Sequence, residues 1–268
     1  MDSSQSSTKF DIYEFGNLLI NFLDLDPVYV LLDGVSFPQE KLERWLLAYW
    51  CFYHMGTSSW IVDQPNYWKA FRMAAESKDY PRCHERRHFR GANASKSVDY
   101  LSQIGVSRLW EGLHGEPIEL SKLTAYVTTW VGFGPWIAFK IADMLERLGI
   151  REVNFDDGAM FLFKSPREGA ELLWSIERGE EVATKETKQQ YAVDQILNHH
   201  LGTYLTPPRF ERSINVQEAE TILCKWKSYM GGRYKVGEDV ESCRESLHKF
   251  PRSKTAQQLL KVGRDSLW

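Results

Sequence analysis

Residues 130 to 136 read Trp130-Val-Gly-Phe-Gly-Pro-Trp136, and an apolar run and then Val153-Asn-Phe-Asp-Asp-Gly158 follow them. Pro135 has the position of a first helical residue, and Gly132 and Gly134 lie just before it. The stretch therefore predicts a glycine hairpin that opens a helix. Exposed N–H groups at such a helix start suit a phosphate, and glycines without Cβ atoms allow a polynucleotide backbone to approach closely.

The acidic pair downstream strengthens this hypothesis. Two glycines before a helix often form a purely structural turn. If the hairpin is considered without the acidic pair, that interpretation stays open. Asp156 and Asp157, however, come just after the apolar residues Ile141, Leu145 and Val153. We therefore expect the pair to lie past a buried helix and to point back toward the hairpin, within one element that spans residues 120–163.

The motif Gly132-Phe-Gly-Pro-Trp-Ile-Ala138, followed by Phe155-Asp-Asp157, resembles the helix-hairpin-helix and catalytic-aspartate signature of the DNA glycosylase superfamily. Trp136 stands where bifunctional members of that superfamily carry a nucleophilic lysine, so the chain resembles the monofunctional type. The resemblance implies that Gly132, Gly134 and Trp136 contact DNA and that Asp157 is the catalytic aspartate.

Two further motifs, Tyr53-His-Met-Gly-Thr-Ser-Ser-Trp60 and Glu85-Arg-Arg-His-Phe-Arg-Gly91, carry a second resemblance. They resemble phage families called amino acid:DNA transferases and α-glutamyl/putrescinyl thymine pyrophosphorylases, which are similar to glycosylases in fold and take part in thymine hypermodification. The matching motifs cover roughly Leu42 to Phe163. This resemblance implies that His54 and Trp60 belong to the substrate site, whereas an ordinary buried or capping role for His54 stays open.

The most cationic part of the chain is the arginine segment, Lys78 to Gly91. It could be a solvated face, but Phe89 inside it and Gly91 at its end indicate that part of it turns inward. Arginine forks match phosphate oxygens bidentately, so we expect a diphosphate or a kinked DNA backbone as the counter-charge. If the segment were helical, positions 86 and 90 would share a face and position 87 would turn away by about 100°. The expected substrate-binding residues here are Glu85, Arg86, Arg87 and Arg90, with Arg86 and Arg90 first.

Composition limits the class of protein. The 268 residues are 43% hydrophobic and include ten Trp, which is typical of a globular chain. No apolar run approaches the roughly 20 residues that span a bilayer, so we expect no membrane partner and a cytoplasmic location, the host cytoplasm if a phage encodes the chain. The net charge of −3 means that any nucleic-acid site is a local basic patch. Four cysteines without C-x-x-C spacing predict reduced thiols, and we expect no metal and no cofactor.

The remaining pattern is helical and contains no sustained strand alternation. Residues 1–9 form a predicted disordered tail, and residues 10–268 a single helical glycosylase-like domain. We expect an all-α fold of the helix-hairpin-helix DNA glycosylase type, with two helical lobes and a cleft flanked by the hairpin and Asp157 and faced by the arginine segment. The predicted helices are Gln39–Val62, a helix from Pro65, Ala92–Gln103, Ser121–Thr129, Pro135–Leu148, Pro166–Ile176, Tyr191–Leu201, Val216–Tyr229 and Val240–Leu247, with Glu177–Lys188 as a loop.

Three functions fit this pattern. In a thymine-modifying transferase, the amine of an amino acid would displace pyrophosphate from the 5-methyl carbon of a thymine flipped out of duplex DNA. Fixed cations would stabilise the leaving group, and Asp157, helped by Asp156 or His88, would take the proton. The alternatives are a monofunctional glycosylase that uses Asp157 and a non-catalytic DNA-binding helical module. The arginine segment favours the transferase, because a glycosylase has no evident use for it.

Overall fold

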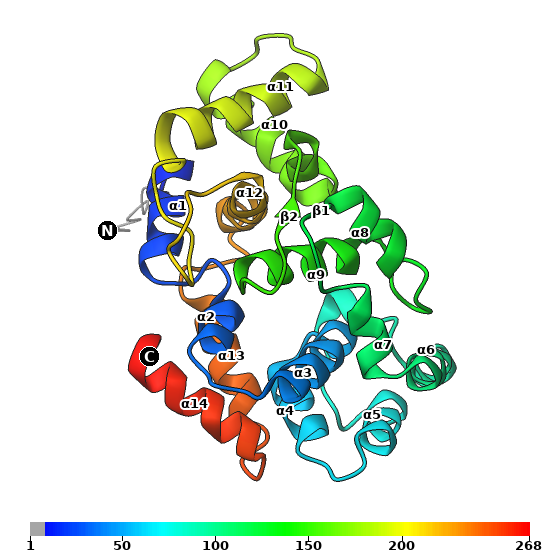
Figure 1. Cartoon of the computed structure of the whole chain (residues 1–268). Helices are drawn as coiled ribbons and strands as arrows, with labels where there is room; N and C mark the ends of the chain where they lie inside the picture. The colour runs from blue at the N-terminus through cyan, green and yellow to red at the C-terminus, as the bar shows by residue number, and fades with distance from the viewer. Residues whose placement is uncertain (1–8) are drawn as a thin grey trace. The chain divides into compact units, whose positions relative to one another are not determined.

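The computed structural model describes residues 9–268, which divide into two compact units. Unit 1 contains residues 9–25 and Phe155–Asp239, and unit 2 contains Asp26–Asn154 and Val240–Trp268. Both units are built from helices, which confirms the predicted all-α class (Figure 1). The predicted disordered tail lies outside the described residues except for Lys9. The single domain and the cleft between two lobes stay predictions.

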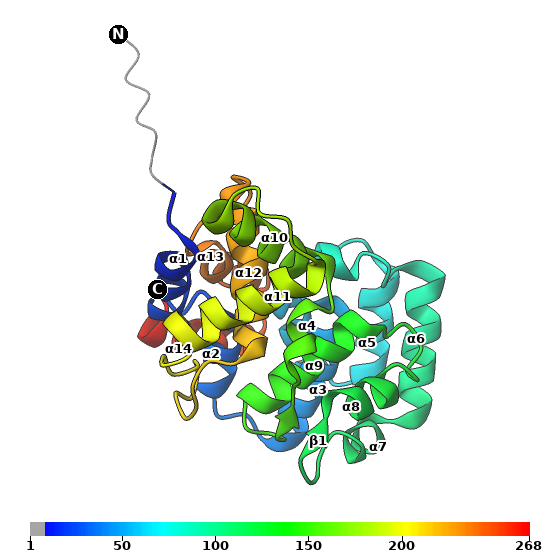
Figure 2. The same cartoon turned by 90° about the horizontal axis from the view of Figure 1, so that it is seen from above.

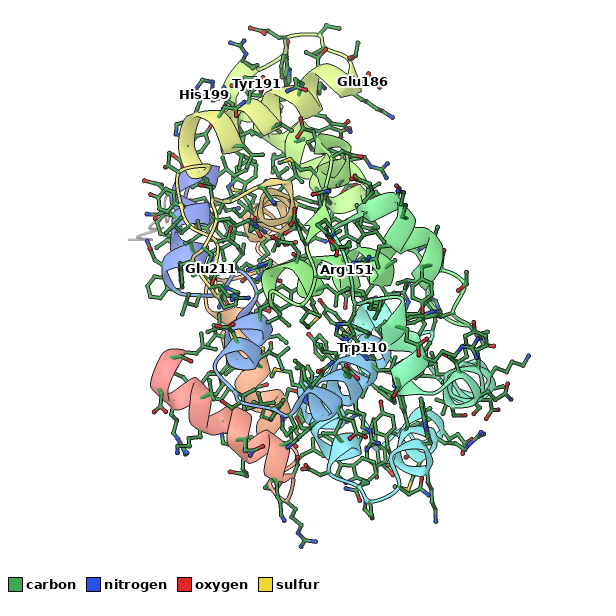
Figure 3. The ribbon with its side chains drawn as sticks, in the orientation of Figure 1. Trp110, Arg151, Glu186, Tyr191, His199 and Glu211 are labelled. Atoms are coloured by element: carbon green, nitrogen blue, oxygen red, sulfur yellow. The ribbon has the colours of Figure 1, made fainter. Side chains whose placement is uncertain are left out.

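The core of unit 2 surrounds α3 (Gln39–Phe52), in which eight consecutive residues, positions 45–52, are buried. α3 contacts α4, α7 and α9, and Figure 1 shows it among them. Trp50 stacks on Trp110 of α7 with ring centroids 5.4 Å apart, and Figure 3 labels Trp110 in this core. The helices of unit 2 are α2 (Pro27–Asp33), α3, α4 (Met55–Val62), α5 (Tyr67–Glu76), the 3₁₀ turn η1 (His84–Arg86), α6 (Gly91–Ile104), α7 (Val106–Glu111), α8 (Leu120–Val127), α9 (Pro135–Arg147), most of α13 (Glu238–His248) and α14 (Lys254–Ser266).

One predicted helix, Gln39–Val62, is divided in the structure. Tyr53 adopts the left-handed conformation with φ of 49° and ends α3, and His54 then caps α4. The sequence did not reveal the break, because both helices are buried and the helical spacing of apolar residues continues across it. Gly56 lies in the first turn of α4, where an added Cβ would stand 2.0 Å from the carbonyl oxygen of Ser246, so only glycine permits this close approach.

Two short strands hold the ends of the hairpin element together. β1 (Ile118–Glu119) pairs in parallel with β2 (Val153–Asn154), with Ile118 opposite Val153. Arg151, labelled in Figure 3, donates from Nε to the carbonyl of Glu116 (2.8 Å) and from Nη1 to the carbonyl of Gly112 (3.0 Å). These contacts fix the chain on both sides of α8 and α9.

Unit 1 is organised around α12 (Val216–Met230), which contacts α1 and α10 and lies between them in Figure 1. The side chain of Asn215 accepts from the first turn of α12, and Glu218 reaches back to the Asn215 N–H, so the two residues form a capping box. The buried Glu218 also pairs with Arg212 at 3.0 Å. The other helices of unit 1 are α1 (Ile12–Asn21), the 3₁₀ turn η2 (Asp157–Phe161), α10 (Lys164–Arg178), α11 (Lys185–Val193) and the π-helix η3 (Asp194–Leu201).

Several predicted boundaries were wrong. α5 begins at Tyr67 rather than Pro65, because Asn66 caps it through Lys69 N. The expected loop Glu177–Lys188 is shorter, since α10 continues to Arg178 and α11 starts at Lys185. The C-terminal residues after the last predicted helix form α14, whose apolar face packs on α2 and α4. Figure 2 shows α5 and α6 side by side, in agreement with their contacts.

Candidate functional site

The arginine segment and the glycine hairpin (Trp130–Trp136) meet at one pocket of about 610 Å³ in unit 2, named here the arginine pocket. Three pieces of chain line it: residues 85–89, the first two turns of α6, and the hairpin with the start of α9. A volume of this size accommodates a small organic or phosphorylated group. Its lining residues are Glu85, Arg86, Arg87, His88, Phe89, Asn93, Lys96, Val131, Gly132, Gly134, Pro135, Trp136 and Ile137.

Arg86 is the buried cation of the pocket, with 7% of its surface exposed. Its Nε donates to the carbonyl of Cys51 (3.1 Å) and its Nη1 to the carbonyl of Gly132 (3.3 Å). The guanidinium lies 5.4 Å from the ring centre of Phe89 and 5.2 Å from that of Phe133. Nη2 is buried and has no hydrogen-bond partner among the described residues. A buried donor without an acceptor costs free energy, so Nη2 is, among the described residues, an unsatisfied donor beside the pocket.

The segment before Arg86 is held by another arginine. Arg82 donates to the carbonyls of Ala74 (3.1 Å), Ser77 (3.0 Å) and Tyr80 (3.3 Å), and also to that of Phe89. Arg82 is therefore a structural residue that closes the loop between α5 and α6. It leaves Glu85, Arg87 and His88 exposed at the pocket.

Only one of the two hairpin glycines, Gly132, has a backbone conformation that favours glycine. Gly132 has φ of 85°, a left-handed value that favours glycine, and Ser97 Oγ would lie 3.2 Å from an added Cβ. Gly134 is extended, with φ of −115°, and an added Cβ would meet nothing within 4 Å among the residues that the structure describes. The fold therefore requires glycine at 132, whereas open space surrounds 134.

The hairpin opens α9 as expected, with Pro135 as first helical residue and Gly134 as N-cap. Within the described part of the chain, no side chain caps this helix start. The N–H groups of Trp136 and Ile137 consequently have no partner within the helix, and both residues line the arginine pocket. Helix geometry at this end favours an anion.

The structure brings seven of the predicted site residues to the pocket. The expected pairing of Arg86 with Arg90 on one helix face was wrong. The segment is not a continuous helix, because η1 ends at Arg86 and Arg90 is the N-cap of α6. Arg86 and Arg90 therefore do not share a helix face, and Arg90 does not line the pocket. The seven residues are Glu85, Arg86, Arg87, His88, Gly132, Gly134 and Trp136.

His54 and Trp60 lie elsewhere in unit 2. The Nδ1 of His54 accepts from Thr57 N at 3.1 Å and caps α4, and burial lowers the pKa of His54 to about 4. Trp60 packs on Tyr80 with ring centroids 4.4 Å apart. Gly56–Ser59, which follow His54, are buried in α4. The substrate roles of His54 and Trp60 stay predictions.

The aspartate pair belongs to unit 1. Asp156 is the N-cap of η2, and its Oδ1 accepts from Ala159 N at 3.0 Å. Asp157 lies in the first turn of η2, where its side chain is exposed and makes no hydrogen bond or ion pair within the described part of unit 1. Asp156 thus has a structural task, whereas no hydrogen bond or ion pair within the described part of unit 1 engages the Asp157 carboxylate.

Sequence reasoning missed two polar residues of the pocket, Asn93 and Lys96 of α6. They are three positions apart and so lie on one side of the helix. The buried positions Ala94, Ser97 and Val98 define the adjoining side. That pattern was readable, but only the packed structure reveals that the polar side borders the hairpin.

The two thiols near Arg86 are poor nucleophiles. Burial raises the pKa of Cys51 to about 12, and burial with the nearby Glu85 raises the pKa of Cys83 to about 12. A thiol is nucleophilic in its ionised form, so neither cysteine is suited to covalent catalysis at neutral pH.

A family model described as amino acid:DNA transferase matches residues 21–234, which include the whole arginine pocket. The chain belongs to the amino acid:DNA transferase family. It is similar to a glycinyltransferase of Pseudomonas phage PaMx11, with 36% identity over 95% of this chain and 96% of that protein. It is also similar to a putrescinyltransferase of Delftia phage PhiW-14, with 28% identity over 84% of this chain and 74% of that protein.

Membership of this family identifies the chain as an enzyme that modifies DNA by amino acid transfer, as the motifs at 53–60 and 85–91 indicated. Within residues 9–268, no helix combines the length and the apolar character that crossing a membrane requires.

Proposed function

We propose that this amino acid:DNA transferase joins the amine of an amino acid to the 5-methylene carbon of a 5-pyrophosphoryloxymethyluracil in DNA and releases pyrophosphate. The observation that carries this proposal is the buried Arg86, which borders the arginine pocket with one donor nitrogen unpaired among the described residues. The names of the two relatives support an amine as the second substrate, since glycine and putrescine both carry one.

The reaction balances without a cofactor. The neutral amine gives its electron pair to the methylene carbon, and a C–N bond forms. The C–O bond to pyrophosphate breaks, and the leaving group takes that electron pair. The new ammonium then loses one proton to a base. Negative charge therefore develops on the leaving oxygen, where fixed donors lower the barrier most.

Arg86 suits this task because it is rigid. Two backbone carbonyls and two aromatic rings hold its guanidinium, so the group needs little reorganisation when charge develops beside it. Arg87 lines the same pocket, and its Nη1 donates to the carbonyl of His84 at 3.3 Å. The two arginines supply a fixed and a more exposed cation for a diphosphate.

The start of α9 is the proposed contact with the DNA backbone. The N–H groups of Trp136 and Ile137 offer donors to a phosphodiester, and the open space around Gly134 admits its close approach. A base inside a duplex is inaccessible to such a pocket, so we propose that the modified uracil is flipped out of the stack.

Asp157 is the proposed general base. Its exposed carboxylate has no partner within the described residues of unit 1, whereas Asp156 is engaged as a cap. The ammonium that forms with the new C–N bond loses one proton, and a positioned carboxylate or imidazole accepts it. His88, exposed at the pocket, is the second candidate for the same proton.

The test uses duplex DNA that carries 5-pyrophosphoryloxymethyluracil, with glycine, putrescine and other amines supplied one at a time. Mass spectrometry of the digested DNA measures the modified nucleoside, and a second assay measures released pyrophosphate. We expect both products to increase together when one of the amines is supplied. DNA with unphosphorylated 5-hydroxymethyluracil is the control and should give neither product. Release of a free base would instead identify a glycosylase, and binding without any product would identify a non-catalytic module.

A further inference from the structure

The arginine pocket has a wall that the arginine segment does not supply. Asn93 and Lys96 form this wall from α6, one helical turn apart. Arg90, in contrast, precedes α6 as its N-cap and lies outside the lining. We infer that Lys96, assisted by Asn93, is the third pyrophosphate-binding residue, in the role that sequence reasoning assigned to Arg90. This inference rests on the proposed pyrophosphate substrate.

The backbone of Lys96 has a fixed position beside the hairpin. The neighbouring Ser97 is fully buried, and its Oγ donates to the carbonyl of Val131 at 2.5 Å. Arg86 donates to the next carbonyl, that of Gly132. α6 and the arginine segment therefore hold two consecutive hairpin carbonyls, so that Lys96 and Arg86 approach the same pocket from different elements.

The charge of Lys96 is available to a ligand. Two acidic residues on and near α6 are engaged by other groups, since Asp99 pairs with Arg72 and Glu76 accepts from Ser95 at 3.0 Å. Glu85 lines the same pocket, and it is exposed and makes no ion pair with the described residues. Lys96 is exposed and makes no ion pair with the described residues. A lysine without an acidic partner keeps its full charge for an incoming anion.

The proposed leaving group has two phosphates, and Lys96 adds a cation on α6 to the two that the arginine segment supplies. Arg86 has one nitrogen that is unpaired within the described residues, which suits the phosphate whose oxygen leaves the carbon. The other phosphate carries about half of the charge of the released pyrophosphate, because the two phosphates of that ion are equivalent. A lysine ammonium on a flexible stem can follow that phosphate as the C–O bond breaks, whereas a stacked guanidinium cannot.

Isothermal titration of inorganic pyrophosphate into the full chain tests the inference. Lys96→Met is expected to weaken pyrophosphate binding by about tenfold or more, the loss of one charge-assisted contact. The matched control Arg90→Met removes one charge from the adjoining turn and is expected to change binding by less than about twofold. Lys96→Arg should restore most of the affinity, because a mobile charge is what this position requires.

Inorganic phosphate provides a second readout. Lys96→Met should reduce the preference for pyrophosphate over phosphate, because Lys96 serves the second phosphate. Equal losses in Lys96→Met and Arg90→Met, or an unchanged affinity in Lys96→Met, would overturn the inference. Absence of pyrophosphate binding by the unaltered protein would instead overturn the proposed function. Far-UV circular dichroism of each variant separates lost binding from lost folding.

Discussion

The Nη1 of Arg86 donates a hydrogen bond to the carbonyl oxygen of Gly132 at 3.3 Å, and so joins the arginine segment to the glycine hairpin. The same guanidinium reaches the last turn of α3 through the carbonyl of Cys51. One side chain therefore positions the proposed leaving-group site relative to the proposed DNA contact. Burial lowers the pKa of Arg86, because the charged guanidinium is removed from water.

Arg86→Lys is expected to lower the free energy of unfolding by about 1–3 kcal/mol, because a lysine cannot satisfy both carbonyls and stack between two rings. Urea unfolding monitored by tryptophan fluorescence measures this change. Arg87→Lys is the matched control, since Arg87 is exposed, and it should change the free energy by less than about 0.5 kcal/mol. Equal stability of the two variants would mean that the carbonyl contacts of Arg86 contribute little.

The two hairpin glycines should separate folding from DNA binding. Gly132→Ala places a Cβ on a left-handed residue and should destabilise the protein by about 1 kcal/mol or more. Gly134→Val meets no atom of the described residues near its Cβ, so its fold should persist. It should nevertheless weaken DNA binding by about 1–3 kcal/mol through the lost approach of a phosphate. Fluorescence anisotropy with labelled duplex DNA checks this, and unchanged affinity of Gly134→Val would exclude the hairpin as the DNA contact.

Asp157→Asn should leave DNA binding intact while lowering turnover by at least about a hundredfold, the low end for a lost general base. Single-turnover measurement of the modified nucleoside provides the rate. Asp156→Asn is the matched control, because asparagine still caps η2 through Ala159 N. If turnover fell about a hundredfold in Asp156→Asn and was unchanged in Asp157→Asn, Asp156 would be the residue that accepts the proton.

His54 should make stability depend on pH. Burial, and to a smaller extent Lys249, lowers its pKa to about 4 in the folded protein, whereas an unfolded histidine has a pKa of about 6.5. The unfolded state therefore binds the proton first as the pH falls. The contribution of His54 to stability is complete above about pH 6.5 and is lost as the pH falls toward 4, up to about 3 kcal/mol.

His54→Asn keeps a capping side chain at this position but removes the titration. Urea unfolding at pH 7 and pH 4.5 should show a smaller loss of stability in this variant than in the unaltered protein. The groups that face His54 are Thr57 on its own helix and Ser246, Lys249 and Phe250 from the C-terminal part of unit 2. An equal loss in both proteins would assign the pH dependence to other residues.

The sequence by itself determined the features that depend on neighbouring residues. Pro135 at the first helical position, the left-handed Gly132 and the apolar periodicity of α3 and α9 were all readable, because caps, turns and helix faces arise from contacts within about four residues. The two motifs at 53–60 and 85–91 also indicated the family, because each is a continuous stretch of chain that is recognisable from its residues alone.

Only the tertiary structure decided which cations share the pocket. The sequence does not distinguish among the four arginines at 82, 86, 87 and 90. In the structure, Arg86 is buried and donates to the carbonyls of Cys51 and Gly132, whereas Arg82 donates to four other carbonyls. Lys96 enters the pocket because Ser97 fixes α6 to a hairpin 34 residues further along the chain. Such choices depend on long-range packing and hydrogen bonding, which a local sequence pattern does not contain.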